Sequence, residues 1–228
     1  MPLLALFDVD GTLFLTHDPL SAEALRDTLV EHYAVVLPAN AVDRIDHPGQ
    51  TALRIAREVL RGTGLDDRAI DDRLRAWCAR FAAAYLVLLA GADTSRWQSA
   101  SGAAAALSRL GRAGVRLALL TGNPESMARA RMERLGLARF FPAGQGAFGC
   151  DAEARSELIE LARGRAGSWP AADTVAIGDT RRDIESARQA GIRSIALRSS
   201  RSTNSFVGAD AVCDDLDSVA TTLLAWAG

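Results

Sequence analysis

Six polar side chains stand just past three short apolar runs of this 228-residue chain, and four of the six are carboxylates. Carboxylates that crowd together repel strongly unless a cation lies among them. Oxygen ligands suit a hard ion, Mg²⁺ before Zn²⁺. A carboxylate nucleophile, a hard cation and a hydroxyl group are parts for moving a phosphoryl group, which depends mainly on positioning and charge stabilisation. In chain order the side chains are Asp8, Asp10, Thr121, Asn123, Asp179 and Asp183.

The apolar runs are typical of strands buried on both faces of a parallel sheet, and capped helical patterns separate them. In such a sheet the carboxyl ends of the strands meet at one edge, so the six side chains converge there. Asn123 and Asp151 are expected to be helix N-caps, which brings Arg155 to the same edge as a cation. We expect strands over Leu3–Phe7, Val115–Leu120, Thr174–Ile177, Ser194–Leu197 and Asp210–Cys213, and helices over Ala103–Arg112, Pro124–Leu135, Ala152–Arg163 and Arg181–Ala190.

The segment 16–96 is too long for a simple crossover between strands, and its apolar spacing is helical. One predicted helix places Leu25, Leu29, Tyr33 and Val36 on one face, and two more cover Gln50–Leu60 and Asp66–Ala90. We therefore predict an α/β protein with a Rossmann-like, doubly wound parallel sheet core, residues 1–15 and 97–228. An α-helical cap domain, residues 16–96, is inserted into it.

The composition excludes several classes of protein. A net charge of −2 provides no basic field for nucleic acid or a membrane surface, and the apolar stretch from Phe81 to Ala92 is too short to span a bilayer. All 26 basic residues are arginines, which excludes Schiff-base chemistry and a P-loop lysine. The short segment Arg198–Arg201 is expected to be a solvated loop. We expect a cytoplasmic monomer or homodimer.

The three cysteines, Cys78, Cys150 and Cys213, form neither a C-x-x-C pair nor a zinc-binding spacing. We expect all three to be free thiols in a reducing compartment.

Taken in order, the motifs resemble those of the haloacid dehalogenase superfamily of phosphohydrolases. Asp8-Val9-Asp10-Gly11-Thr12-Leu13 matches the first motif, Thr121-Gly122-Asn123 the second, and Gly178-Asp179-Thr180-Arg181-Arg182-Asp183 the fourth. The third motif usually supplies a lysine, and Arg155 resembles the arginine of a subgroup. Gly49-Gln50-Thr51 resembles a cap segment of phosphoglycolate-phosphatase-like members, although Ala52 stands where that group has Asp.

The resemblance implies a Mg²⁺-dependent phosphatase that hydrolyses a small phosphomonoester through an aspartyl-phosphate. Asp8 is then the nucleophile, Asp10 the acid and base, and Thr121 and Arg155 bind the transferring oxygens. The implied metal ligands are Asp8, the main-chain carbonyl of Asp10, Asp179 and Asp183. The candidate substrate-binding residues are Gly122, Asn123, His47, Gln50 and Arg54.

Other functions use the same motifs. A phosphomutase shares all of them, whereas a haloacid dehalogenase needs no metal and lacks the second aspartate of the first motif. A non-catalytic phosphate-binding regulatory module is the alternative outside enzymes. If Arg155 is not the third-motif cation, the next candidates are Arg131, Arg134, Arg163 and Arg165.

Overall fold

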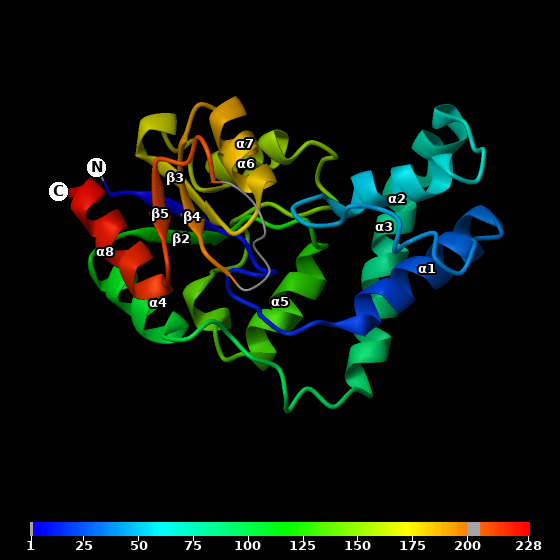
Figure 1. Ribbon diagram of the computed structural model, residues 1–228, viewed down its shortest axis with the longest axis horizontal. Helices are drawn as coiled ribbons and strands as arrows, with labels where there is room; N and C mark the ends of the chain where they lie inside the picture. Colours follow the sequence, from blue (N-terminus) through cyan, green and yellow to red (C-terminus); the bar gives the residue numbers. More distant parts are fainter. Residues whose placement is uncertain (1, 200–205) are drawn as a thin grey trace.

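The computed structural model describes residues 2–199 and 206–228, and within them one parallel sheet of five strands forms the core (Figure 1). The strand order is β2-β1-β3-β4-β5. All neighbouring strands are parallel, so their carboxyl ends meet at one edge, as the sequence predicts. The strands are β1 (Leu4–Phe7), β2 (Arg116–Leu119), β3 (Thr174–Gly178), β4 (Arg193–Leu197) and β5 (Ala211–Cys213).

Helices cover both faces of the sheet, which explains why its central strands are apolar throughout. Ala5 and Phe7 of β1 join one core, and Leu4 and Leu6 join another on the opposite face. The first core is shared with α4 (Ala103–Arg112), α5 (Glu125–Arg134) and α8 (Leu216–Ala227), and the second with α6 (Arg155–Arg165) and α7 (Arg181–Gln189). Two 3₁₀ turns, Ala138–Phe140 and Ala171–Asp173, lie in the connections. The predicted doubly wound α/β fold is confirmed.

Several local predictions need correction. The helix α8 was not predicted from the sequence; it begins with a capping box formed by Asp215 and Ser218. Asp151 is not an N-cap, because α6 starts behind Ala154 and the Asp151 carboxylate accepts a hydrogen bond from the Phe148 amide instead. Of the segment Arg198–Arg201, the structure describes only the first two residues; the other two lie outside the described ranges.

Three helices inserted between β1 and α4 form a core of their own, on the right of Figure 1: α1 (Pro19–Tyr33), α2 (Ala52–Arg61) and α3 (Asp67–Ala90). We call α1, α2 and α3 the inserted helices. Leu25, Leu29 and Tyr33 are buried as predicted, but Val36 is 91% exposed. The reason is that α1 ends at Tyr33, and Ala34 then takes a left-handed conformation that breaks the helical spacing. None of the described helices is long and apolar enough to cross a membrane.

The first turn of α2 docks onto the sheet domain through main-chain atoms. The Ala52 amide donates to the Gly122 carbonyl at 2.8 Å, and the Leu53 amide donates to the Gly149 carbonyl at 3.3 Å. Helix-start amides lack partners within their own helix, so the loops of the sheet domain satisfy them here. A Cβ atom on Gly122 would lie 1.9 Å from the carbonyl oxygen of Gln50, so only glycine allows this approach.

Side chains reinforce the same contact. Arg57 of α2 pairs with Glu153 at 2.6 Å, and the Thr51 hydroxyl donates to the Glu153 carbonyl at 2.9 Å. From α7, Arg182 donates to the Pro48 carbonyl at 2.6 Å. These contacts hold the inserted helices against the carboxyl edge of the sheet.

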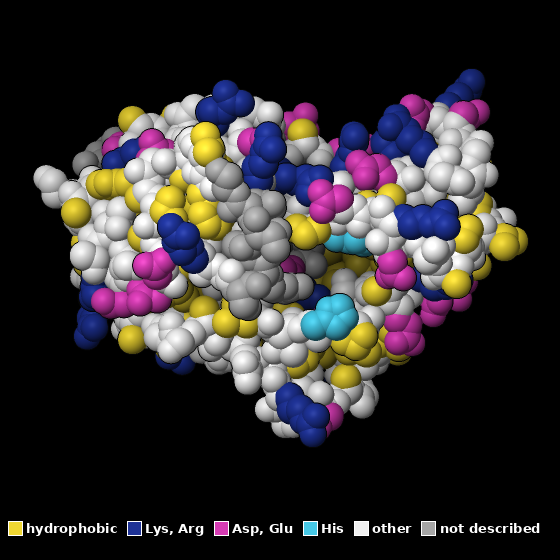
Figure 2. Space-filling model, viewed as in Figure 1, with side chains coloured by type: hydrophobic (Ala, Val, Ile, Leu, Met, Phe, Trp, Pro, Cys, Tyr) yellow, Lys and Arg dark blue, Asp and Glu magenta, His cyan; other side chains and the backbone are white. Residues whose placement is uncertain are grey.

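Between the sheet domain and the inserted helices the surface is hollowed, and histidine side chains lie beside the hollow (Figure 2).

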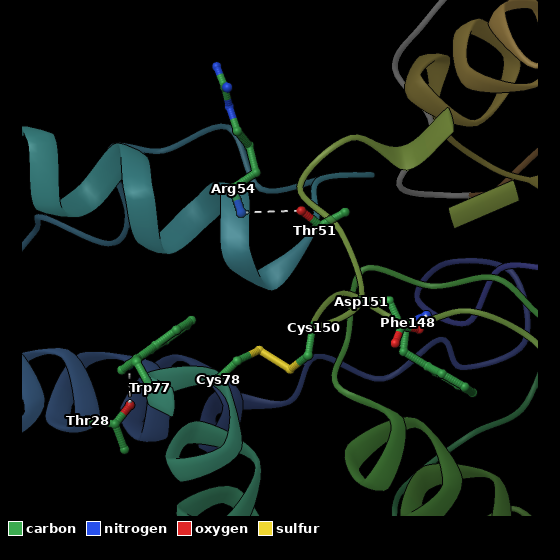
Figure 3. Close-up of a disulfide and its surroundings, with 8 residues drawn as sticks. All are labelled: Thr28, Thr51, Arg54, Trp77, Cys78, Phe148, Cys150 and Asp151. Atoms are coloured by element: carbon green, nitrogen blue, oxygen red, sulfur yellow. Dashed lines mark hydrogen bonds between the residues drawn. A yellow bond between two sulfur atoms is a disulfide. The ribbon is translucent and has the colours of Figure 1, made fainter. Parts of the chain in front are cut away.

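A disulfide between Cys78 and Cys150 also joins the two parts of the molecule. Figure 3 shows it running from α3 to the loop that precedes α6. The prediction of three free thiols is therefore wrong for these two residues, which lie 72 positions apart in sequence and meet only through the tertiary fold. Cys213 is buried and free, as predicted.

We predict that reduction of this disulfide destabilises the protein. A disulfide that closes a loop of this length restricts the unfolded chain, so dithiothreitol should lower the free energy of unfolding by about 2–4 kcal/mol. Denaturant titration of the wild type with and without the reductant measures the loss. Cys150→Ala should not respond to the reductant, whereas Cys213→Ala should respond like the wild type. A wild type that is equally stable in both conditions would contradict the prediction.

Candidate active site

Three buried carboxylates meet where β1 and β3 end. Asp8 directly follows β1, and its amide extends the pairing with β3 by donating to the Ile177 carbonyl at 2.9 Å. Asp179 and Asp183 follow β3. Each of the three offers one carboxylate oxygen, and these oxygens lie within 4.8 Å of one another. The register of the two neighbouring strands therefore brings together residues that are far apart in the sequence.

The fold fixes the orientation of the two aspartates after β3. Asp183 is the third residue of α7, and its Oδ2 accepts hydrogen bonds from the amide and the hydroxyl of Thr180, at 2.9 and 2.6 Å. This capping box leaves Oδ1 directed at the neighbouring carboxylates and Arg155. Asp179 accepts a hydrogen bond from the Ser199 hydroxyl at 2.9 Å.

Arg155 is the cation of the cluster, as the sequence reasoning expected. It is the first residue of α6, and its side chain is only 6% exposed. Its Nη2 contacts Asp8 Oδ1 at 2.8 Å and Asp183 Oδ1 at 2.5 Å, and it donates to the Leu120 carbonyl at 3.1 Å. Its Nε is buried and has no hydrogen-bond partner among the described residues. That N–H is therefore a buried donor that the described residues leave unsatisfied.

The electrostatics of the cluster favour a divalent cation. Burial raises the pKa of Asp8 well above its usual range; Arg155 opposes the rise, while the carboxylates of Asp183, Asp179 and Asp10 add to it. When the three clustered aspartates are ionised, one guanidinium offsets only one of their charges. The remaining two negative charges, carried by oxygen ligands, fit Mg²⁺.

Asp10 lies beside this cluster and is held by the second motif. Its side chain is 41% exposed, and the Asn123 amide group donates to Asp10 Oδ2. The same amide group donates to the Thr121 hydroxyl at 3.1 Å. Asn123 is therefore not the predicted N-cap, because its side chain turns toward Asp10 and Pro124 occupies the cap position.

Arg131 binds Asp10, a contact that was not predicted from the sequence. This arginine of α5 is fully buried and donates to both carboxylate oxygens of Asp10, at 2.9 and 3.2 Å. A signal for it was present in the sequence: Arg131 stands on the same helical face as Met127 and Ala128, which are buried. A cation on an apolar face needs buried partners, and their identity follows only from the fold.

The three candidate residues from the inserted segment lie in different surroundings. His47 Nε2 is hydrogen-bonded to the Val42 carbonyl at 2.8 Å, within its own loop. Gln50 and Arg54 both contact Glu58, at 3.2 and 2.8 Å. These two residues line a cavity of about 960 Å³ between the inserted helices and the sheet domain, and Arg155 lines it too. Gln50 and Arg54 thus lie on the same cavity as Arg155, although none of the three clustered carboxylates is among the described residues that line it.

Comparison with known proteins agrees with this geometry. Residues 3–191 match the family model of the haloacid dehalogenase-like hydrolases. The chain is 34% identical over 224 residues to a phosphoglycolate phosphatase from Rhodospirillum rubrum, covering 96% of this chain and 90% of that one. It is 28% identical over 210 residues to a phosphoglycolate phosphatase from Pseudomonas putida, covering 86% and 70% of the two chains.

The fold also matches that of solved structures. The crystal structure of CbbY from Rhodobacter sphaeroides in complex with phosphate aligns with a TM-score of 0.63 at 23% identity, over 96% of each chain. A structure described as a predicted phosphoglycolate phosphatase from Haemophilus somnus aligns with the same TM-score at 16% identity. From the matched family, the relatives and the carboxylate cluster, we conclude that the chain belongs to the haloacid dehalogenase-like hydrolases, as a hydrolase of phosphoric monoesters.

Proposed function

We propose that the protein is a Mg²⁺-dependent phosphatase that hydrolyses a small phosphomonoester through an aspartyl-phosphate on Asp8. The observation that carries the proposal is the buried cluster of Asp8, Asp179 and Asp183 with Arg155 at the carboxyl edge of the sheet. A carboxylate nucleophile and an anionic phosphate repel each other, and the two cations supply the opposite charge.

Asp8, Asp179 and Asp183 would hold the Mg²⁺, together with the main-chain carbonyl of Asp10. When bound, the ion neutralises the carboxylates and the phosphate oxygens. Arg155 would add a second positive charge: its Nη2 is engaged by Asp8 and Asp183, and its unpartnered Nε–H would bind an oxygen of the phosphoryl group. Thr121 and the backbone of Gly122 and Asn123 would bind the remaining oxygens.

The reaction takes place in two displacements at phosphorus. A carboxylate oxygen of Asp8 attacks, an O–P bond forms, and the bond to the ester oxygen breaks. The departing alkoxide takes a proton from Asp10 and leaves as an alcohol. Asp10 then accepts a proton from a water molecule that attacks the same phosphorus. The bond from phosphorus to Asp8 breaks, which releases inorganic phosphate and restores both aspartates.

The inserted helices favour a small substrate. We propose that residues 16–96 act as a cap over the sheet edge, because the first turn of α2 already contacts the loops of Gly122 and Gly149. Figure 2 shows arginines interspersed with acidic side chains on the face it displays, whereas a polyanion needs a continuous basic stripe. Phosphoglycolate is the first substrate to test, because the relative from Rhodospirillum rubrum carries that name.

A panel of phosphate esters tests the proposal. With Mg²⁺ the wild type should release phosphate from phosphoglycolate or another small ester with a higher kcat/KM than from phosphopeptides or 5′-phosphorylated oligonucleotides. Asp8→Asn should lower kcat by at least about 10³-fold while remaining folded by circular dichroism, because the nucleophile is lost. A preference of tenfold or more for a polymer would contradict the small-substrate proposal. Undiminished hydrolysis by Asp8→Asn would contradict the mechanism, and conversion of a sugar phosphate to its isomer would indicate a phosphomutase.

Metal binding is testable without measuring activity. Mg²⁺ at about 100 times its Kd should stabilise the EDTA-treated protein by about 2.7 kcal/mol, which corresponds to a rise in Tm of about 5–10 °C. Because the pKa of Asp8 is raised, the metal-free protein retains its proton on Asp8 to a higher pH than the unfolded chain does. The proton competes with the cation, so the rise in Tm should be largest at high pH and shrink as the pH falls.

Two variants control this measurement. Asp179→Asn removes one of the clustered carboxylates and should abolish most of the Mg²⁺-dependent rise in Tm. Asp214→Asn changes an exposed surface carboxylate, whose side chain is 84% exposed, and should leave the rise unchanged. The same rise in both variants would show that Mg²⁺ binds elsewhere.

Arg155 should be required for turnover. Arg155→Ala leaves Asp8 and Asp183 without their shared donor and removes a ligand for the phosphate, so kcat should fall by at least about 100-fold. Arg155→Lys keeps the charge without the planar fork and should recover part of the loss. Steady-state kinetics measure both, and Arg181→Ala, whose side chain is 72% exposed, is the matched control. An Arg155→Ala enzyme as active as that control would remove Arg155 from the site.

A further inference from the structure

We propose that Arg131 is a positioning residue for Asp10, and that it makes the placement of the Asp10 carboxylate depend on the docking of the inserted helices. The inference rests on the proposed function, which gives Asp10 the proton transfers. Arg131 reaches Asp10 from α5, over a separation of 121 residues in sequence. Among the described residues, the hydrogen-bond partners of Arg131 are Asp10, Asp18 and Tyr85, so its role differs from that of Arg155, which binds Asp8 and Asp183.

The guanidinium of Arg131 is held too firmly to reorient on its own. Its side chain is 2% exposed and lies over the rings of Phe14 and Tyr85, 5.1 and 5.3 Å from their centroids. Its Nη1 donates to both oxygens of Asp10, and its Nε donates to the Tyr85 hydroxyl at 3.2 Å. Because this one nitrogen is itself held in place, it keeps both oxygens of Asp10 turned toward it.

Two donors from different elements together define where the Asp10 side chain lies. Asn123, from the loop after β2, binds Oδ2, and Arg131, from α5, binds both oxygens. The Asp10 side chain is 41% exposed, so it faces open space on its remaining side. An unsupported aspartate with that exposure would populate several rotamers, whereas proton transfer needs one placement.

The same guanidinium also binds the inserted helices. Its Nη2 donates to Asp18 Oδ2 at 2.9 Å, and the Tyr85 hydroxyl donates to the same oxygen at 2.6 Å. The other oxygen of Asp18 accepts a hydrogen bond from the Leu20 amide, so Asp18 is the N-cap of α1. Asp18 therefore belongs to the start of α1, and Tyr85 belongs to α3. A displacement of these helices from the sheet domain would separate Arg131 from both partners and release its hold on Asp10.

Burial alone would not require the contact with Asp10. A buried cation needs a compensating charge, and Asp18, whose side chain is 3% exposed, already provides one next to the Tyr85 hydroxyl. The second ion pair, to the half-exposed Asp10, is what connects this buried network to the candidate site. That pairing carries the inference.

The choice of leaving group separates a positioning role from a structural one. An alkoxide is a poor leaving group and needs the proton of Asp10, whereas p-nitrophenolate leaves without one. The parameter kcat/KM covers the reaction up to departure of the alcohol, so the later attack of water on the aspartyl-phosphate does not enter it. Loss of positioning at Asp10 should therefore lower kcat/KM for an alkyl ester far more than for an aryl ester.

The experiment measures kcat/KM with Mg²⁺ for the best alkyl phosphate of the panel and for p-nitrophenyl phosphate. Arg131→Met should lose about 100-fold or more on the alkyl ester and less than about fivefold on p-nitrophenyl phosphate. Arg131→Lys should recover part of the loss on the alkyl ester. Arg134→Met, an exposed change one turn further along α5, is the matched control and should behave like the wild type. Equal losses on the two esters, or no loss on either, would overturn the proposal.

Two further variants keep the test decisive if Arg131→Met does not fold. Tyr85→Phe removes only the hydroxyl that joins Arg131 to α3, and it should show the same bias against the alkyl ester, about 5- to 20-fold. Arg131→Met combined with Asp18→Asn removes the buried cation together with its buried counter-charge. A wild type that hydrolyses neither ester would overturn the proposed function itself. A wild type that hydrolyses both, with variants that show no bias, would overturn only the role of Arg131.

Discussion

Repulsion among the carboxylates buried at one edge of the sheet is the constraint on which the rest of the structure depends. Ionised carboxylates lose their hydration on burial, and three of them within 4.8 Å raise one another's free energy. The fold tolerates this because Arg155 reaches the edge from the first turn of α6 and pairs with two of the three. The compensation is incomplete, and an incompletely compensated anionic site attracts a cation.

The surrounding elements keep the side chains in this arrangement. Pairing of β1 with β3 sets Asp8 beside Asp179, and the capping box of α7 commits one oxygen of Asp183 to Thr180. Without these constraints the three carboxylates could turn away from one another into solvent, which would lower their electrostatic free energy. The stability of the sheet and of the helix starts thus supplies the free energy that keeps the site assembled.

The sequence predicted the parts of this structure that depend on local patterns. Apolar runs located the strands, their ends located Asp8, Thr121 and Asp179, and the absence of lysine directed attention to Arg155. Contacts that depend on packing were out of reach. The disulfide joins cysteines on separate elements. The partners of Arg131 lie at the start of α1, on α3 and in the loop after β1. Val36 fits a helical period, but a single left-handed residue ends the helix before it.

The docking of α2 through glycine carbonyls has a consequence for how such an enzyme can diversify. The bonds that seat its first turn join backbone to backbone, between Ala52 and Gly122 and between Leu53 and Gly149. The side chains of Gln50 and Arg54 take no part in those bonds, although both line the cavity. New side chains at these two positions would therefore change the lining of the cavity while the seat of the helix stays the same. A mutant library confined to them would vary the shape and charge of that cavity largely apart from folding.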